Sequence, residues 1–435
     1  MKIAILGGGA LRVLGVVNDI LSRPEVFEQP QLTFMDLDVA RAQTLASLSC
    51  KMPTARSNMP ATHVTDDLDE ALEGADFAFC YLRVGGVAAL EHDKRVAAAH
   101  GFHGHDDFGP SAVLLTARTV PVVLDIARRM ETLCPAAPLL IFSNPITNLV
   151  DAVTRYTNTG AIGLCSGVYN VAWDLDHLFG VGAPNPDLSY RGGGLNHLSW
   201  ILPSSRIGDK LVMDMIWEAW DDLPDRAGAA RCAWDLNAPL VLLDRVLPMN
   251  NGHHTHFFYH DFLAKRMADG FAAAGPDDLR SAQQDQAAAA AAALAQLPQI
   301  DDFWEQEPLK PCCTSPFGDL GVKTMTAICT DSGDELPINI PNRGHIVGLP
   351  EGAVVEAFTK VGSDRMEPLG LDPIPTHHKA LCCHIAAHQR LLVDAAVADD
   401  KDLLKQAMLC EPTINDIERA SPMFEILWAA HAAGR

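Results

Sequence analysis

Short apolar runs alternate with amphipathic segments through the first half of the chain. Residues 2–6 form an apolar run with β-branched members, and residues 11–20 follow with apolar positions at helical spacing. Residues 114–133 have the same helical spacing. Further strand candidates occur at residues 31–36, 77–82, 139–142 and 162–164. This alternation predicts an α/β fold with a doubly wound parallel sheet, in which ligands bind at the carboxyl ends of the strands.

Longer helical segments dominate the second half. The alanine-rich residues 281–297 predict a helix, and residues 377–432 also have helical character. Residues 331–350 are rich in Gly, Pro, Asn and Asp, which predicts a loop or a set of short strands. We therefore expect a sheet domain over residues 1–200 and a second, mainly helical α+β domain over residues 201–435.

Three glycines separate the first predicted strand from the first predicted helix. Gly7 and Gly9 match the first two positions of G-x-G-x-x-G, whereas Arg12 stands at the third. The start of a helix after such a turn, here Ala10 and Leu11, can hold a pyrophosphate through backbone N–H groups and the helix dipole. By itself the pattern also fits a tight turn in another α/β protein.

An acidic residue at the end of the second predicted strand strengthens the nucleotide interpretation. Asp36 lies somewhat beyond the ~20-residue offset at which an acid meets the ribose hydroxyls of a dinucleotide. The order of strand, glycines, helix, strand and acid predicts a Rossmann-type domain that binds NAD. Arg41 nearby leaves NADP as an alternative, because a 2′-phosphate prefers an arginine.

Composition narrows the class of partner and compartment. The 435 residues carry a formal net charge of −22, which disfavours nucleic acid and anionic membranes. Eleven cysteines, some adjacent in sequence, fit no small disulfide framework, and reduced thiols in a cytoplasm are the simpler interpretation. The N-terminal apolar run is too short for a signal peptide, and we expect no membrane-spanning segment.

Three polar residues follow predicted strand ends: Arg83, Asn144 and Cys165. Cys165 and His197 are the most informative pair, because a thiolate and an imidazole can bind a divalent ion and leave positions open for substrate hydroxyls. From the residues alone, a buried cysteine and a hydrogen-bonded histidine are also possible, and so is a nucleophilic cysteine, although no partner base is evident.

Other histidines and acids form local groups. His384 and His388 have the i, i+4 spacing of a helical zinc pair, but Ile385 stands where a metalloprotease needs glutamate, so we interpret them as structural. The turn at residues 105–110 is either a solvated loop or a source of carboxylates. A further histidine group is formed by His253, His254 and His256.

With these motifs laid out, the chain resembles the NAD-dependent family-four glycoside hydrolases over nearly its whole length. The motifs in order are the glycines at 7–9, Arg83-Val84-Gly85-Gly86, Asp107-Phe108-Gly109-Pro110, Ala117-Arg118-Thr119-Val120-Pro121, Ser143-Asn144-Pro145, Gly163-Leu164-Cys165, Gly194-Leu195-Asn196-His197 and the stretch from Asn339 to Glu356. The resemblance implies that Cys165 and His197 are metal ligands, usually for manganese.

The resemblance also implies a mechanism that differs from the two-carboxylate route of most glycosidases. NAD⁺ takes hydride from C3 of the sugar, which acidifies the C2 proton. A base then removes that proton while the metal stabilises the enediolate, and the glycosidic oxygen leaves from C1. Water then adds, and NADH returns the hydride.

The implied roles follow the matched motifs. The base falls on His254, with Tyr259 as a nearby rival, because phosphoglycosidases of the family place a tyrosine there. Asp107 is assigned to substrate or metal-bound water. The expected cofactor-binding residues are Gly7, Gly9, Ala10, Leu11, Arg12, Asp36 and Arg83, and the expected substrate-binding residues are Asn144, Asn196, Arg118 and Arg343.

One departure from the family pattern concerns the substrate. The 6-phosphoglycosidases carry an arginine a few residues after the Gly-Gly pair, where this chain has Leu90 and Glu91. That resembles the subgroup that cleaves unphosphorylated α-glucosides, α-galactosides and α-galacturonides. We therefore expect an unphosphorylated hexoside or hexuronide as substrate, and a homodimer or homotetramer.

Two other functions compete with this expectation. A 2-hydroxy-acid dehydrogenase of the lactate and malate type has the same fold and an Asn-Pro turn like Asn144-Pro145, but no metal at the positions of Cys165 and His197. A non-catalytic sugar or nucleotide sensor descended from the enzyme is the third possibility. Stoichiometric accumulation of NADH would indicate the dehydrogenase, and turnover of any glycoside would exclude the sensor.

Overall fold

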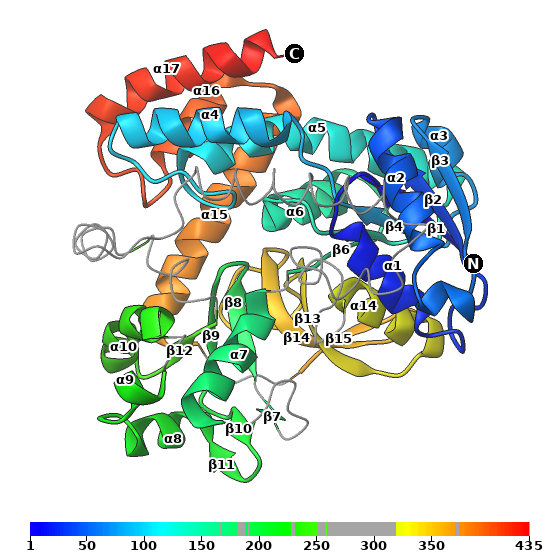
Figure 1. Ribbon diagram of the computed structural model, residues 1–435. Helices are drawn as coiled ribbons and strands as arrows, with labels where there is room; N and C mark the ends of the chain where they lie inside the picture. Colours follow the sequence, from blue (N-terminus) through cyan, green and yellow to red (C-terminus); the bar gives the residue numbers. More distant parts are fainter. Residues whose placement is uncertain are drawn as a thin grey trace.

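A single large sheet runs through the molecule (Figure 1). The computed structural model describes residues 1–165, 167–180, 188–189, 191–227, 231–249, 258, 319–369 and 374–434. Within them the large sheet has 12 strands, in the order β12-β9-β8-β14-β13-β6-β5-β4-β1-β2-β3, with β15 paired to β14. The predicted helix at 281–297 lies outside the described residues.

The N-terminal half of this sheet is parallel. Its strands are β1 (Lys2–Leu6), β2 (Gln31–Met35), β3 (Ala61–Thr65), β4 (Phe77–Cys80), β5 (Leu139–Ile141) and β6 (Ala161–Gly163). They pair in the order β3-β2-β1-β4-β5-β6, all parallel. This is the Rossmann order, whose direction reverses between β1 and β4 and so opens a crevice for a ligand there. The predicted fold class is confirmed.

Helices cover both faces of the parallel half. Fully buried residues of α1 (Val13–Leu21), α2 (Val39–Ser49) and α14 (Leu320–Thr330) pack on one face. Those of α3 (Leu68–Leu72), α5 (Gly109–Leu133) and α6 (Ile146–Tyr156) pack on the other. Because both faces are covered, the central strands β4, β5 and β6 are buried and apolar over their full length, whereas the edge strand β3 is largely exposed and carries polar residues.

Antiparallel strands extend the sheet beyond β6. They are β13 (Asp334–Pro341), β14 (Val354–Val361), β15 (Met366–Pro368), β8 (Gly192–Leu195), β9 (Leu198–Ile201) and β12 (Leu247–Pro248). β13 joins β6 through the pairing of Asn339 with Gly163. A small sheet of β7 (Leu188–Ser189), β10 (Arg206–Ile207) and β11 (Lys210–Leu211) lies apart from it. The continuous large sheet does not test the division at residue 200, which stays a prediction.

Residues 331–350 differ from the prediction of a loop or several short strands. Residues 334–341 form one eight-residue strand that pairs along its whole length with β14. Proline suits only strand positions whose N–H is not needed for pairing. Pro337 is tolerated because β6 pairs with β13 only at Asn339. On that side of the strand, β6 therefore needs no backbone N–H at position 337.

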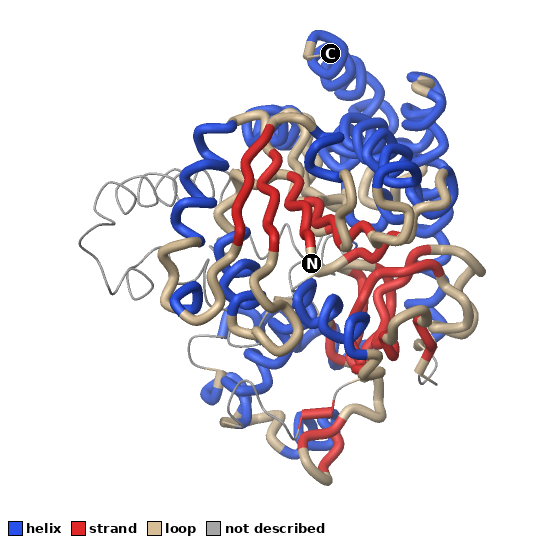
Figure 2. Tube along the Cα trace, turned by 90° about the vertical axis from the view of Figure 1, so that its right-hand side faces the viewer, coloured by secondary structure: helices blue, strands red, loops and turns tan. Residues whose placement is uncertain are grey.

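The remaining helices form two groups outside the sheet (Figures 1 and 2). Around α5 pack α4 (Gly86–Ala99), α15 (Thr376–Ala398), α16 (Lys401–Leu409) and α17 (Ile417–Ala433). At the opposite end lie α7 (Gly167–Phe179), α8 (Val212–Glu218), α9 (Leu223–Arg226) and α10 (Arg231–Asp244). The expected helical character of residues 377–432 is confirmed by α15 to α17.

Helix α5 is the one described helix that is long and apolar enough to cross a membrane by these two criteria alone. Within its most apolar window, 78% of the residues are buried inside the structure. The hydrophobic spacing predicts this helix only from residue 114, but it begins at Gly109, with Pro110 in its first turn. Proline suits that turn because its missing N–H would have no helical partner there.

The helical layer at the C-terminus allows a test of packing. Phe424 on α17 is fully buried against the helices around α5, whereas Ile426 on the same helix is 46% exposed. We expect Phe424→Ala to lower the free energy of unfolding by about 3–5 kcal/mol, because it leaves a cavity. Ile426→Ala, the matched control, should change it by less than about 0.5 kcal/mol. Urea unfolding of both variants measures the difference, and equal effects would contradict the assigned packing.

A buried carboxyl group gives the fold a pH dependence. Glu411 lies between α16 and α17, and burial raises its pKa from 4.5 to about 7. Between these two values the folded state retains a proton that the unfolded state has lost, so stability decreases as the pH rises from 4.5 to 7. Relative to Glu411→Gln, the wild type should lose about 2–4 kcal/mol over this window. Unfolding measured at several pH values checks this, and parallel curves for both proteins would contradict it.

Candidate active site

The glycine turn after β1 has the close backbone contacts that a dinucleotide site requires. Gly7 has a φ of 88°, and a Cβ there would lie 2.8 Å from the carbonyl oxygen of Tyr81 at the end of β4. The N–H groups of Gly7 and Gly8 both donate to the carbonyl of Met35, at 2.9 and 2.8 Å. The turn is therefore held between β2 and β4, at the switch point of the sheet, and only glycine fits at position 7.

Asp36 is part of this turn. Its Oδ2 accepts a hydrogen bond from the N–H of Gly9 at 2.8 Å, and its Oδ1 accepts one from the N–H of Asp38 at 3.0 Å. A Cβ on Gly9 would lie 2.9 Å from the same carboxylate and 3.3 Å from side-chain carbons of Arg41. The space above Gly9 is thus lined by Asp36 and Arg41. In the sequence, Asp36 favours NAD, whereas Arg41 leaves NADP as an alternative.

Arg12, which replaces the third glycine, points to the aromatic residues beyond the strands. Its guanidinium carbon lies 5.1 Å from the centre of the Phe142 ring, a cation–π distance. The Phe142 and Tyr81 rings stack with centroids 4.8 Å apart. Arg12 immediately precedes α1. Its side chain extends over Phe142, which follows β5 and stacks on Tyr81, which follows β4.

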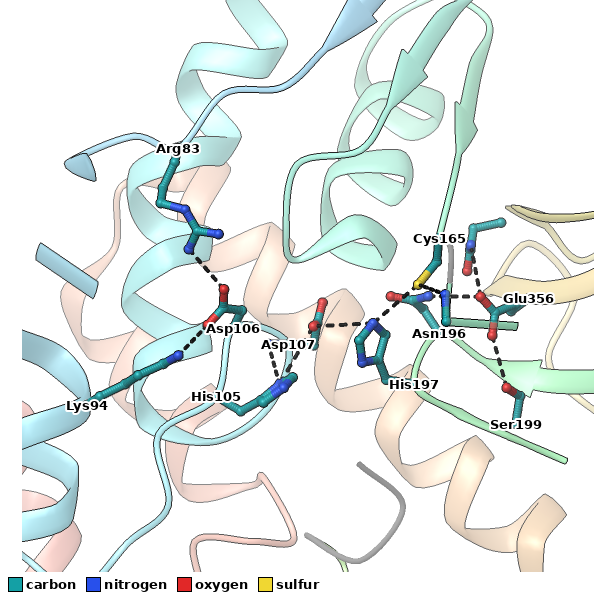
Figure 3. A network of polar contacts seen from close by, with 12 residues as sticks. Arg83, Lys94, His105, Asp106, Asp107, Cys165, Asn196, His197, Ser199 and Glu356 are labelled. Atoms are coloured by element: carbon teal, nitrogen blue, oxygen red, sulfur yellow. Dashed lines mark hydrogen bonds and ion pairs between the residues drawn. The ribbon is translucent and has the colours of Figure 1, made fainter. Parts of the chain in front are cut away.

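Cys165 and His197 lie together, as the resemblance implied. Cys165 comes two residues after β6, and His197 lies in the two-residue turn between β8 and β9. The Cys165 Sγ is 3.3 Å from the His197 Nε2, and the Gly167 N–H donates to the same sulfur at 3.3 Å (Figure 3). Two segments that are distant in sequence therefore present one sulfur and one imidazole nitrogen to the same point.

The loop before α5 adds a carboxylate and a second imidazole. Asp107 Oδ2 lies 3.7 Å from the Nε2 of His197 and 3.6 Å from the Nδ1 of His105. One ligand atom from each of these three residues lies within 4.8 Å of the others. The backbone N–H of Asp107 donates to His105 Nδ1 at 3.1 Å, which fixes the loop locally. The turn that the sequence left undecided thus supplies a carboxylate and an imidazole to the Cys165–His197 pair.

The charges around His197 favour a cation. Burial alone would lower the pKa of His197, but the nearby Asp107 carboxylate and the Cys165 thiol outweigh burial and raise that pKa to about 10. Burial raises the pKa of Asp107. An imidazole, a thiol and a carboxylate that are buried together can all coordinate a divalent metal, which would then replace the proton held by His197. The residues present therefore fit a metal.

A second charge cluster lies beside this group. Asp106 accepts from Arg83 at 2.9 Å through one oxygen and from Lys94 of α4 at 2.7 Å through the other (Figure 3). Burial would raise the pKa of Asp106, but the two cations hold it well below its usual range. Arg83, predicted to bind the cofactor, is thus in an ion pair next to the predicted metal site.

The predicted substrate residues are distributed unevenly. Asn144 is half-buried after β5, and Asn196 is buried beside His197, with its Nδ2 donating to Glu356 Oε1 at 3.0 Å. Arg118 of α5 forms an ion pair with the buried Asp93 of α4, so the structure places it in helix packing. Arg343 is exposed after β13, and within the described part of the chain no ion pair or side-chain hydrogen bond connects it to the site.

Two predictions lie outside the described residues: His254 and Tyr259, the alternatives for the base. Conversely, sequence reasoning did not assign roles to His105, Asp106 and Glu356, which the structure brings to the site. His105 and Asp106 adjoin Asp107, so their proximity was a usable signal. Glu356 stands in an apolar strand, and nothing in the local sequence indicates which residues face it. His384 and His388, interpreted as structural, each contact a backbone carbonyl of the α16 segment.

Comparisons with known proteins agree with this geometry. A probable 6-phospho-β-glucosidase of Bacillus subtilis is 25% identical and covers 100% of this chain and 97% of its own length. An α-galactosidase of Rhizobium meliloti is 26% identical over 96% of this chain and 84% of its own. The crystal structure of a 6-phospho-α-glucosidase from gut microorganisms, in complex with NAD and Mn²⁺, has a TM-score of 0.83 at 18% identity, covering 100% of this chain and 98% of that one.

Family models account for most of the chain. The family 4 glycosyl hydrolase model matches residues 2–181, which contain the glycine turn, Asp107 and Cys165. The model of the family's C-terminal domain matches residues 193–414, which begin just before the turn that carries His197. The Cys165–His197 pair is therefore divided between the two matched regions, and the resemblance inferred from the motifs is confirmed. This chain belongs to family 4 of the glycosyl hydrolases.

Proposed function

We propose that the enzyme cleaves an unphosphorylated hexoside or hexuronide with the help of NAD and a divalent metal, which we take to be Mn²⁺. The observation that carries the proposal is the distance of 3.3 Å between Cys165 Sγ and His197 Nε2, with the Asp107 carboxylate 3.7 Å from the same nitrogen. A lactate- or malate-type dehydrogenase has no use for this sulfur–imidazole pair, and membership in the glycosidase family sets that alternative aside.

The cofactors are assigned from how well the residues at the site suit a dinucleotide and a divalent metal. Gly7, Gly9 and Asp36 form a turn with no room for a side chain at position 7, as the backbone of a dinucleotide site requires. Cys165 and His197 would hold the metal, with Asp107 and His105 beside it. A similar fold holds both NAD and Mn²⁺ in the 6-phospho-α-glucosidase structure. We extend both cofactors to this chain, and prefer NAD to NADP because Asp36 would repel a 2′-phosphate.

When bound, NAD⁺ supplies a hydride acceptor for C3 of the sugar, and the metal supplies the positive charge that acidifies the C2 proton. The residues of the chain then have defined tasks. Asn196 accepts a hydrogen bond from a sugar hydroxyl through its Oδ1, because its Nδ2 donates to Glu356, and Asn144 forms a hydrogen bond with another hydroxyl. Asp107, whose pKa is raised by burial, exchanges a proton with the substrate or with water at the site. Because Asp107 and His197 are buried, little bulk water competes with these interactions.

The base that removes the C2 proton is proposed to be His254, with Tyr259 as the alternative. Arg118 and Arg343 remain proposed substrate contacts. Arg118 would have to bind substrate while paired with Asp93, and Arg343 is exposed. We also propose a homodimer or homotetramer, as the resemblance to the family implies. A cytoplasmic location is proposed because the cysteines in the described part of the chain are free thiols, as a reducing compartment would keep them.

The Asp106 cluster supports an unphosphorylated substrate. In the described part of the chain, Arg83 and Lys94 are cations beside the site that could bind a phosphate, but each is already paired with an oxygen of Asp106. The cluster carries one net positive charge, whereas a phosphate monoester approaches a charge of −2 and would also meet the Asp106 carboxylate. Neutral hydroxyls or a single carboxylate suit this cluster better. Named relatives include both phosphoglucosidases and α-galactosidases, so this substrate class is our proposal.

Removing either metal ligand should abolish the metal-dependent reaction. We expect Cys165→Ala and His197→Ala to lower kcat/KM on the best aryl glycoside by at least about 100-fold at fixed Mn²⁺, because outer-sphere changes alone cost 10–100-fold. A panel of aryl α- and β-glycosides and uronides, assayed with NAD⁺ and Mn²⁺ under reducing conditions, identifies that substrate. For the wild type in D₂O, the product should carry deuterium at C2.

The deuterium measurement separates this route from direct hydrolysis. A product without deuterium at C2, or stoichiometric accumulation of NADH, would contradict the proposed mechanism even if a glycoside is cleaved. Asp69→Asn, which breaks an exposed ion pair with Arg129 remote from the site, is the control and should retain wild-type kinetics.

Neutralising Asp106 should relax discrimination against phosphate. In Asp106→Asn the side chain keeps its size, but Arg83 and Lys94 gain free charge. We expect the ratio of kcat/KM for a 6-phosphoglycoside to that for its unphosphorylated counterpart to rise about tenfold, equivalent to about 1.4 kcal/mol. Parallel kinetics on the two substrates measure the ratio. A wild type that prefers the phosphorylated substrate, or a variant with an unchanged ratio, would refute this assignment.

A further inference from the structure

Glu356 is a buried carboxylate that the reaction described above does not use. It lies on β14, is 1% exposed, and its strand neighbours are apolar. Placing a carboxyl group in such a position is unfavourable unless hydrogen bonds compensate. Glu356 is paired in register with Gly194 of β8, so its side chain lies beside the β8–β9 hairpin that carries His197.

The two oxygens of Glu356 hold the hairpin on both sides of His197. Oε1 accepts from Asn196 Nδ2 at 3.0 Å, one residue before the histidine, and Oε2 accepts from Ser199 Oγ at 2.9 Å, two residues after it (Figure 3). The amide of Asn196 lies between Glu356 and the Cys165–His197 pair in the same view. Because its Nδ2 is committed to the carboxylate, its Oδ1 is directed away from Glu356.

The same carboxylate also reaches the strand that precedes Cys165. Asn339 Nδ2 lies 3.4 Å from Glu356 Oε1 and 3.4 Å from the carbonyl oxygen of Gly163, the last residue of β6. Cys165 follows Gly163 by two residues. Glu356 therefore connects, through Asn339, the end of the parallel sheet to the antiparallel hairpin.

The backbone of His197 needs such support. Its φ of 61° lies in the left-handed region, which is uncommon for a residue other than glycine. The turn has only two residues, because Leu195 and Leu198 are already paired. A conformation of this kind persists only where the surroundings fix it. The pairing of β8 with β9 constrains this turn, and the hydrogen bonds to Glu356 from both flanks support it further.

We propose that Glu356 is a positioning residue that sets the separation and orientation of Cys165 and His197, and of the Asn196 amide, for a divalent cation. It acts through Asn196, Ser199 and Asn339 and does not itself touch the cation. Oε1 can accept both amide N–H groups whether or not the carboxyl group is ionised. The role of the cation in glycoside cleavage rests on the proposed function, whereas the positioning of its ligands does not.

The test is the affinity of the purified full-length protein for Mn²⁺ under reducing conditions, measured by the electron paramagnetic resonance signal of free Mn²⁺. We expect Glu356→Ala to weaken binding by about 10–100-fold. Glu356→Gln should weaken it by less than about threefold, because its carbonyl still accepts both amides and its amide can donate to the Ser199 hydroxyl. Titration with Co²⁺ adds a spectroscopic readout, since thiolate-to-cobalt absorption reports whether Cys165 remains a ligand.

Controls separate positioning from loss of the fold. Asp151→Asn alters another buried carboxylate, paired with Arg155 on α6, and should lower the thermal unfolding temperature without changing the Mn²⁺ affinity. If Glu356→Ala does not fold, Ser199→Ala removes one hydrogen bond of the same carboxylate and should weaken Mn²⁺ binding by about threefold.

The possible results are distinct. Wild-type affinity in Glu356→Ala and Ser199→Ala would overturn the inference and leave the proposed function untouched. A Glu356→Gln protein as weak as Glu356→Ala would also overturn it, because charge and not hydrogen bonding would then be responsible. A wild type that binds no Mn²⁺ would refute both the inference and the proposed metal, and wild-type turnover of glycosides independently reports the function.

Discussion

The site depends on the join between β6 and β13. That contact consists of a single paired position, Asn339 with Gly163, yet it attaches five antiparallel strands and β15 to the edge of a parallel sheet. Through it the carboxyl end of β6, with Cys165, meets the β8–β9 turn, with His197. Without this join, one half of the molecule would carry a nucleotide turn and a thiol, and the other half an imidazole with no partner.

Electrostatics at this join are arranged for a cation. Three groups that can carry negative charge, on Asp107, Cys165 and Glu356, surround His197, and their combined effect exceeds the penalty of burial on the charged imidazole. A few ångströms away the balance is different, because Asp106 is shared by Arg83 and Lys94. The adjacent residues Asp106 and Asp107 thus belong to two environments, Asp106 facing two cations and Asp107 facing the imidazoles of His105 and His197. For this reason we propose that Asp107 lies beside the metal, whereas the Asp106 cluster selects the charge of the substrate.

Much of the nucleotide half could be predicted because its signals are local. A buried parallel strand is apolar over its full length, and a glycine is required where another part of the backbone passes very close. Both features can be recognised from a few consecutive residues. The strands at 2–6, 77–82 and 139–142 and the turn at Gly7 follow from such rules. The motifs of the family extended this to Cys165 and His197. Residues 331–350 were predicted as a loop or a set of short strands and not as the single long strand β13, because Pro337 and the loop-forming residues around it give no local sign of the pairing with β14.

The sequence by itself determined the fold class and the glycine turn, because these rest on short-range patterns, and the family motifs, kept in order, singled out Cys165 and His197 as a pair that the structure places together. Only the tertiary structure decided which charges meet: Arg118 packs against Asp93, Arg83 and Lys94 share Asp106, and His105 joins Asp107. The same holds for Glu356, whose partners Asn196, Ser199 and Asn339 stand 17 to 160 residues away along the chain. The physical reason is that ion pairs and hydrogen bonds act over a few ångströms in space and leave no periodicity in the sequence.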